Sequence, residues 1–298
     1  MVSSSQAAVL PRARWQDLQE RHIARADELT AAHRERIARR ETHPVWDFLF
    51  TYYSYKPAVL RRWHPGAGMV LADAADAPQA TWRWYRLLRE TGEVSVDVDA
   101  FWRDRGDGTE HVRALLSATS TRPARFGCFG MHEWAMVYRQ TEHRHPVPLR
   151  LGQAGTDDVV EAHDLRCTHF DAFRFFTPEA EPRNERQLTR DSQPRSEQPG
   201  CLHAGMDLYK WALKLGPVVP GSVLLDSFEL ARDIRELDMR ASPYDLSDWG
   251  FSPVPVETAE GKAEYVRQQR AFADRGQRLR DDLIGAVERA RPVTEVLA

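Results

Sequence analysis

The sequence has little cysteine and no long apolar run, and each deficit excludes a class of protein. Only three of the 298 residues are Cys, and none is close to another. We therefore expect free thiols rather than a disulfide framework or a C-x-x-C zinc knuckle. No apolar stretch approaches the roughly 20 residues that cross a bilayer, and the N-terminus lacks the features of a signal peptide. These absences predict a cytoplasmic protein without a membrane partner.

The chain also lacks an excess of positive charge and the best-known nucleotide and hydrolase motifs. Its formal net charge is −3 and its pI is about 6.4, which argues against an obligate, strongly electrostatic nucleic-acid binder. A local basic groove is compatible with these values. No P-loop, Rossmann glycine fingerprint or G-x-S-x-G elbow is present. P-loop NTPases, Rossmann oxidoreductases and α/β-hydrolases are therefore disfavoured.

Helical periodicity dominates the remaining sequence. Apolar residues at helical spacing predict helices over about 14–40, 79–89, 110–119, 204–215, from a Ser222 cap to near Pro243, and over about 259–291. The Arg105-Gly-Asp-Gly stretch is interpreted as a turn before the third of these. With 42% hydrophobic residues the chain can bury a substantial core. We predict a mainly α fold: a single compact helical domain over 1–298 with a few short strands and long loops.

The segment 177–200 interrupts this pattern. It holds four prolines and almost no apolar residue, which predicts a long loop. Long loops within a domain often act as lids or binding elements, and a surface excursion is the alternative.

Chemically capable side chains gather between Phe126 and Asp245. His132 and Glu133 lie in an apolar, glycine-punctuated stretch, where a charged group is costly unless it is paired or bound to a ligand. They could act as general acid and base, and the alternative is a buried ion pair with an arginine such as Arg139.

Five further residues supply metal-ligand atoms. His163, His169, Asp171, His203 and Asp207 are of the types that bind zinc, iron or manganese, although their spacing matches no known signature. His203 and Asp207 are four residues apart and would share one face of a helix, which is also typical of a structural hydrogen-bonded pair. The identity of any metal is left open at this point.

Asp238 stands out from the acidic stripe of its helix. Leu237 and Met239 flank it, and it falls at the predicted helix end beside Arg240 and Tyr244. A partly buried carboxylate held by Arg240 could act as a base or stabilise a cationic transition state. Helix termination and capping is the alternative.

An aromatic segment over 43–66 is the main candidate for substrate contact. Aromatic rings beside cationic groups suit the stacking of a flat base and the pairing of phosphate, whereas core packing is the alternative. Its candidate substrate-binding residues are Tyr52, Tyr53, Tyr55, Lys56, Arg62 and Trp63, and Trp134, Arg240 and Tyr244 join them from the later motifs.

Three motifs carry a resemblance to a known family. They begin at Phe126-Gly-Cys-Phe-Gly-Met-His-Glu-Trp, Cys201-Leu-His-Ala-Gly-Met-Asp and Arg235-Glu-Leu-Asp-Met-Arg-Ala-Ser-Pro-Tyr-Asp. Here the chain resembles a family of actinobacterial proteins labelled 3-methyladenine DNA glycosylase, over nearly all of its length from His43 to Val266. The resemblance implies a DNA-repair hydrolase that excises an alkylated purine from DNA or a nucleoside and assigns no catalytic residue.

Two functional hypotheses follow. In the first, an N-glycosylase without a required cofactor uses Asp238 or Glu133 as its carboxylate and the aromatic segment as a stacking wall. In the second, a helical metal-dependent enzyme uses a divalent ion in an oxidative or hydrolytic reaction on a small molecule. The residues of this second hypothesis are His132, Glu133, His163, His169, His203 and Asp207. The candidate catalytic residues over both are Asp238, Glu133, His132, His203 and Asp207, and the candidate metal ligands are His163, His169, Asp171 and His203. A non-catalytic binding protein is the third and least favoured interpretation.

Overall fold

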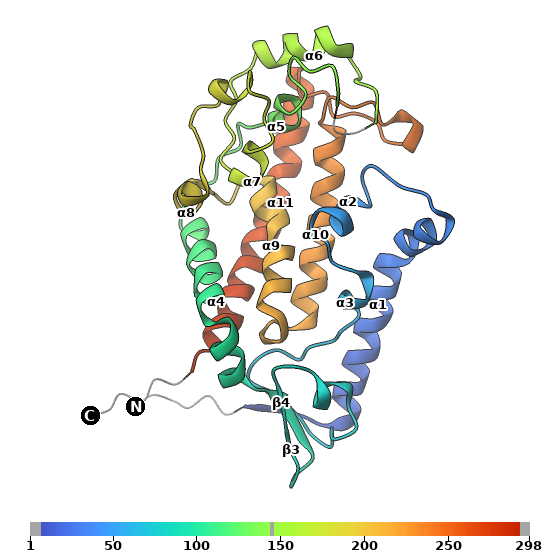
Figure 1. Cartoon of the computed structure of the whole chain (residues 1–298), viewed down its shortest axis with the longest axis vertical. Helices are drawn as coiled ribbons and strands as arrows, with labels where there is room; N and C mark the ends of the chain where they lie inside the picture. The colour runs from blue at the N-terminus through green and yellow to red at the C-terminus, as the bar shows by residue number, and fades with distance from the viewer. Residues whose placement is uncertain (1–6, 144–145, 293–298) are drawn as a thin grey trace, which may run out of the picture.

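Helices form most of the computed structural model, which describes residues 7–143 and 146–292 (Figure 1). The helices are α1 (Arg12–Arg39), α2 (Phe48–Tyr52), α3 (Pro57–Leu60), α4 (Val98–Ser120), α5 (Met131–Ala135), α6 (Gly152–Glu161), α7 (Phe170–Phe173), α8 (Gln193–Ser196), α9 (Leu202–Leu215), α10 (Gly221–Arg240) and α11 (Ala259–Arg289). The strands are β1 (Ala8–Leu10), β2 (Met69–Leu71), β3 (Tyr85–Leu88) and β4 (Glu93–Val96). The predicted mainly α fold is confirmed. Within these residues no helix combines the length and apolarity needed to cross a membrane.

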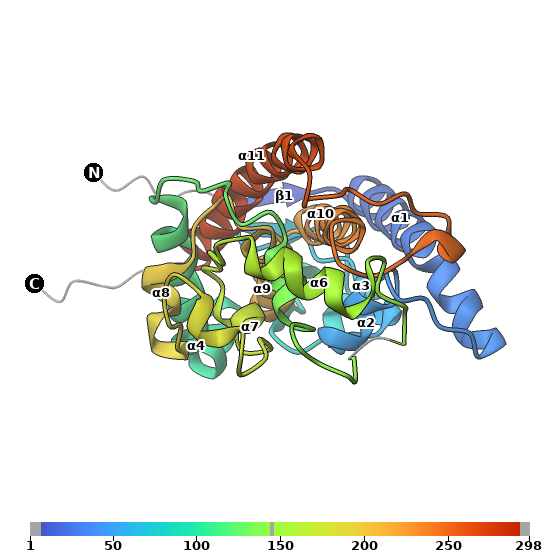
Figure 2. The same ribbon diagram turned by 90° about the horizontal axis from the view of Figure 1, so that it is seen from above.

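Four long helices, α4, α9, α10 and α11, form a bundle along the long axis of the molecule (Figures 1 and 2). Helix α9 is apolar around most of its circumference, as expected for a helix with neighbours on several sides. Gly205 permits close packing with α10, because a Cβ there would lie 3.0 Å from Ile234 Cδ1. The short connection 216–220 brings α10 back antiparallel to α9. The start of α9 and the end of α10 therefore meet at the same end of the bundle.

Short elements cover that end of the bundle. Helices α5, α6 and α7 lie over it in both views, whereas the sheet lies at the opposite end (Figures 1 and 2). The sheet has the order β1-β2-β4-β3, with β1 and β2 parallel and the other pairs antiparallel. Helix α1 flanks the bundle, where Arg25 forms ion pairs with Asp226 and Glu229 of α10.

The predicted helix over 79–89 is wrong. Residues Pro78–Thr81 form a 3-10 turn, and β3 follows, with Tyr85 and Leu87 half-buried and Arg86 and Leu88 exposed. This two-residue alternation is the pattern of a strand with one covered face.

Two further boundaries differ from the sequence prediction. The stretch from Arg105 to Gly108 is not a turn but lies inside α4, and Ser222 is not a cap because α10 already begins at Gly221. The other long helices agree with prediction to within about two residues, the uncertainty usual for helix ends. The predicted loop 177–200 contains only short helical turns, the longest of them α8.

Replacing Gly261 with alanine is expected to lower the free energy of unfolding by about 2–3 kcal/mol. An added Cβ would lie 1.9 Å from the backbone oxygen of Pro255, so the start of α11 would have to shift. Gly108→Ala in α4 is the matched control, because no atom lies within 4 Å of its Cβ position. The control should gain roughly 0.5–1 kcal/mol, since glycine is unfavourable inside a helix. Urea unfolding of both variants tests this, and equal stabilities would contradict the steric argument.

Candidate metal centre

Two imidazoles and one carboxylate from separate helices converge at the covered end of the bundle. His132 belongs to α5, His203 to the first turn of α9, and Asp238 to the last turn of α10. One ligand-type atom from each lies within 4.8 Å of the other two. We call His132, His203 and Asp238 the first triad. Sequence reasoning had selected all three residues and had placed the two histidines in one hypothesis, but it had not grouped Asp238 with them.

A glycine positions the histidine of α5. Gly130 precedes this helix with φ of +71°, a conformation that other residues rarely adopt. A Cβ at this position would lie 3.3 Å from the ring of Tyr265, so the close approach also favours glycine. The chain can thus turn sharply at Gly130 and place His132 opposite α9 and α10.

The geometry of the first triad is compatible with three ligands of a single ion. His132 Nε2 lies 3.0 Å from Asp238 Oδ1, both side chains are buried, and neither atom makes a hydrogen bond of good geometry. The His132 and His203 rings are 4.3 Å apart at an interplanar angle of 85°. Two ligand atoms that bind the same ion, each at about 2.0–2.2 Å from it, lie roughly 3–3.5 Å from each other. The His132–Asp238 separation fits this value.

Arg235 fixes the other oxygen of the carboxylate. Its Nη1 lies 3.3 Å from Asp238 Oδ2 and donates to Glu133 Oε1 at 3.0 Å, and its guanidinium stacks 3.9 Å from the centre of the Phe48 ring. Glu133 is thus in a buried ion pair, but its partner is Arg235. The suggested partner Arg139 instead pairs with Glu161. Sequence reasoning missed Arg235, although its position three residues before Asp238 on α10 was a signal.

A second triad lies next to the first. His169 Nε2 is 3.3 Å from Asp207 Oδ2 and 3.4 Å from Glu197 Oε1, and all three side chains are buried. The His169 and His203 rings are 5.3 Å apart, so the two triads meet at His203. Glu197 lies in the predicted loop and escaped sequence reasoning, because no local pattern marks it.

The second triad already has a cation. Lys210 Nζ donates to Asp207 Oδ2, the oxygen that faces His169, and lies 3.3 Å from Asp171 Oδ2. Asp171 also accepts a 2.8 Å hydrogen bond from Arg190 Nη2. Sequence reasoning had not selected Lys210, although it lies one helical turn after Asp207.

A cation supplied by the protein distinguishes the triads. In the second triad, Lys210 contacts the oxygen of Asp207 that faces His169, and Arg174 and Arg190 pair with the neighbouring Asp171. In the first triad, Glu133 and Asp238 face Arg235, and the remaining negative charge is balanced by a proton on His132 or would be balanced by a bound cation. Asp238 Oδ1, the oxygen that faces His132, has no Lys or Arg partner within residues 7–143 and 146–292. The first triad is therefore the better metal site.

The protonation states agree with this assignment. Burial, reinforced by the neighbouring His132, holds the pKa of His203 well below its ordinary value, which leaves this imidazole neutral. Burial alone would raise the pKa of Asp238, but the charge of His132 outweighs it and the pKa is lowered. Burial would lower the pKa of His132, but the charge of Asp238 raises it. A metal would take the place of that proton.

In the second triad, the pKa shifts follow from the same balance. Burial would lower the pKa of His169, but Glu197 and Asp207 raise it. Burial raises the pKa of Glu197. Burial also opposes the charge of Lys210, yet Asp207 keeps the pKa of that ammonium above its ordinary value. The second triad is thus arranged around an imidazolium and an ammonium.

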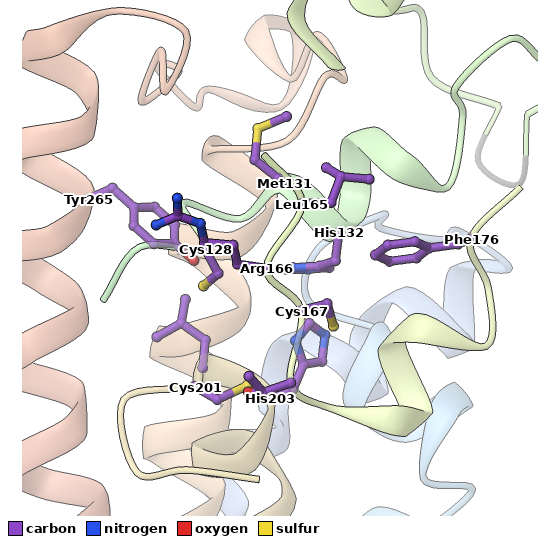
Figure 3. Close-up of a pocket in the computed structure, with 12 residues that line it drawn as sticks. Cys128, Met131, His132, Leu165, Arg166, Cys167, Phe176, Cys201, His203 and Tyr265 are labelled. Atoms are coloured by element: carbon purple, nitrogen blue, oxygen red, sulfur yellow. The ribbon is translucent and has the colours of Figure 1, made fainter. Parts of the chain in front are cut away.

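Small cavities flank His203. One, of about 20 Å³, is lined by His132, His203 and all three cysteines of the chain (Figure 3). The other, of about 30 Å³, is lined by Tyr53, Glu133, His203 and Asp207 among others. A water molecule needs roughly 10–15 Å³ measured in this way. Each cavity therefore accommodates only one or two small molecules of the size of water or dioxygen.

The aromatic segment is divided between two places. Tyr53 reaches the second triad, where its hydroxyl donates to Asp207 Oδ1 at 2.9 Å, and Tyr52 lines the same cavity. Trp63 instead belongs to a separate apolar cluster with Trp15 and Leu71. Of its other candidates, Tyr55 is half-buried, and Lys56 and Arg62 are exposed. The segment therefore does not form one continuous stacking wall.

Four other candidates do not face the first triad. Trp134 is buried and donates through its indole N–H to Ala241 O at 2.9 Å, and Tyr244 packs in an apolar cluster with Val147. Arg240 donates to the carbonyl of Ser252 and pairs with Glu236, so it does not hold Asp238 as predicted. His163 Nδ1 lies 2.6 Å from Val159 O in its own chain segment. The proposed roles of Arg240 as partner of Asp238 and of His163 beside the other metal candidates are not supported by this geometry.

Comparison with protein-family models, with curated proteins and with solved structures finds no match to this chain.

Proposed function

We propose that the chain is a metal-dependent enzyme that holds one ferrous ion on His132, His203 and Asp238 and catalyses an oxidative reaction on a small molecule. One observation carries the proposal: His132 Nε2 and Asp238 Oδ1 lie 3.0 Å apart, buried and without a good hydrogen bond, beside a second imidazole. Two histidines and one carboxylate with open positions are typical of non-haem iron oxygenases.

The adjoining cavity supports the oxidative role. It offers about 20 Å³ next to His132 and His203, enough for a water or a dioxygen molecule in an open coordination position. The surrounding side chains are largely apolar, among them Met131, Leu165 and Phe176. Such a shell limits the access of bulk water to a bound ion and shapes its reactivity. Arg235 orients the carboxylate from behind, as outer-shell partners of metal ligands commonly do.

Metal analysis of the purified protein tests this proposal. Protein stripped with EDTA under anaerobic conditions is expected to take up one equivalent of Fe(II) per chain, and the loaded protein should consume dioxygen faster than the stripped one. The exposed His111 of α4 provides a control, since His111→Gln should leave the stoichiometry at one. If the stripped protein takes up zinc in preference to Fe(II), the proposed reaction is hydrolytic and not oxidative. Folded, stripped protein that takes up neither ion would rule out the metal centre.

The N-glycosylase hypothesis stays a prediction based on the family resemblance. Tyr52 and Tyr53 lie near Asp207, so aromatic rings and a carboxylate do occur together. The cavities of about 20 and 30 Å³ do not hold a purine, and base excision would require this end of the bundle to open. Mass spectrometry of bases released from methylated duplex DNA by EDTA-treated protein tests the hypothesis. Release of 3-methyladenine without metal would support it over the metal-dependent enzyme.

A further inference from the structure

A strongly basic pocket lies beside the first triad. It has a volume of about 220 Å³, and the predicted loop 177–200 forms one of its walls. Its charged lining consists of Arg122, Arg125, Arg166, Arg186, Arg195 and a single acid, Glu185. Five arginines around one acid are unusual in a chain whose formal net charge is −3. The pocket therefore concentrates positive potential in one place, which attracts anions.

Two acids neutralise part of this positive charge: Asp164 pairs with Arg166 at 2.8 Å, and Glu185 lies between two other arginines. Glu185 is shared between Arg125 and Arg186, at 3.7 and 3.9 Å. Arg195 has no ion pair within residues 7–143 and 146–292. Arg122 is different, because its guanidinium donates to the carbonyls of Glu197 and Pro194 and so fixes the loop. One arginine thus holds the loop in place, and the charge of Arg195 together with part of the charge of Arg125 and Arg186 is left for a ligand.

The basic pocket shares a wall with the cavity of the first triad. Arg166, Cys167 and Thr168 line both of them, and Figure 3 shows Cys167 near His203, whereas the side chain of Arg166 extends toward Cys128 and Tyr265. A molecule bound to the arginines therefore lies against this wall, and the imidazoles lie on its other side. The arrangement separates the recognition of charge from the reactive centre by one layer of side chains.

We infer that this pocket binds the substrate of the proposed enzyme and that the substrate is a small carboxylate or phosphate. The identification of the bound anion as a substrate rests on the proposed function, whereas the binding of an anion to the pocket does not. Guanidinium groups pair with carboxylate and phosphate oxygens through two parallel hydrogen bonds, which suits both chemistries. The volume of about 220 Å³ admits a small molecule, not a duplex.

Calorimetric titration with inorganic phosphate, and separately with malonate, tests the inference. Both titrations are made on EDTA-treated and on Fe(II)-loaded protein at constant ionic strength. The Arg125→Gln/Arg195→Gln variant should bind the preferred anion at least tenfold more weakly. The Arg86→Gln/Arg103→Gln variant is the matched control, because it removes the same charge from exposed positions on β3 and α4. The single Arg195→Gln variant, at an exposed site, repeats the test should the double variant unfold.

The outcomes separate the possible ligands. Phosphate binding without malonate binding, or the reverse, identifies the anionic group. Equal affinity of the double variant and the control would overturn the inference, and so would tight binding of a fluorescein-labelled single-stranded oligonucleotide with no binding of either small anion. If the native protein takes up no Fe(II) but the EDTA-treated protein still binds the anion, the proposed iron enzyme is contradicted and the anion site is not.

Discussion

Replacing Arg235 with methionine is expected to lower the free energy of unfolding by about 3–5 kcal/mol. The guanidinium is fully buried between Glu133 and Asp238, at 3.0 and 3.3 Å. Methionine fills much of the same volume but leaves the buried Glu133 without its cation and Asp238 with only the imidazole of His132. Removing one partner of a buried ionic group costs more than the group contributes as a whole, because the remaining charges stay desolvated.

Thermal and urea unfolding check this expectation, with Arg232→Met as the control. Arg232 lies one turn earlier on α10, and its side chain, 39% exposed, pairs with the adjacent Asp233. The control should change stability by about 0.5 kcal/mol or less. Similar losses in the two variants would mean that Arg235 contributes through its aliphatic stem and its packing on Phe48, not through its charge.

The stability loss of Arg235→Met should depend on pH, because it depends on the charge of Asp238. Burial tends to raise the pKa of Asp238, but His132, His203 and Arg235 outweigh it and lower the pKa. The stability that Asp238 contributes is therefore present above its unfolded pKa of about 4 and is lost as the pH falls further. Without Arg235 the depression is smaller, and protonation relieves the buried charge. The stability difference between the native and Arg235→Met proteins should thus stay constant from pH 7 to about 4 and shrink as the pH is lowered further.

Long apolar stripes explain why the helical fold could be predicted. In α11, Tyr265, Leu279, Leu283 and Val287 recur at helical spacing, and all four are buried. The prediction failed at 79–89, where aromatic and apolar residues crowd a window too short to separate a period of two from one of 3.6. Pairing with β4, which no local pattern specifies, makes residues 85–88 a strand. Tertiary context thus decided the short elements, whereas periodicity decided the long ones.

The site residues were predictable by type but not by grouping. His132, His203 and Asp238 were candidates because ionisable groups in apolar surroundings need a partner, and the structure places them in one cluster. Their convergence depends on the antiparallel packing of α9 and α10, which joins residues far apart in the sequence. Glu197 could not be predicted, since it lies in a polar loop where a buried carboxylate has no local signature. The loop itself was predicted, with a lid or binding element and a surface excursion as alternatives, but its position as a wall of the basic pocket required the fold.

Asp238→Asn is expected to weaken Fe(II) binding by about 100-fold or more while the protein stays folded. Changes to outer-shell partners of a metal ligand already cost about 10–100-fold in affinity, and this substitution removes a ligand charge itself. Folding should persist because asparagine has nearly the same shape and Arg235 keeps its hydrogen bond to Glu133. Competition titration with a chromophoric chelator measures the affinity, and Asp233→Asn, a partly exposed position on the same helix, is the control.

The same variant separates the two functional hypotheses. The metal-dependent enzyme loses its ion and its oxidative turnover together in Asp238→Asn, and a large excess of Fe(II) restores part of both. The N-glycosylase loses base release in this variant, but the loss does not respond to added metal, because there the carboxylate acts on the departing base directly. If Asp238→Asn binds Fe(II) as tightly as the native protein but releases no base, Asp238 is a catalytic carboxylate and not a metal ligand.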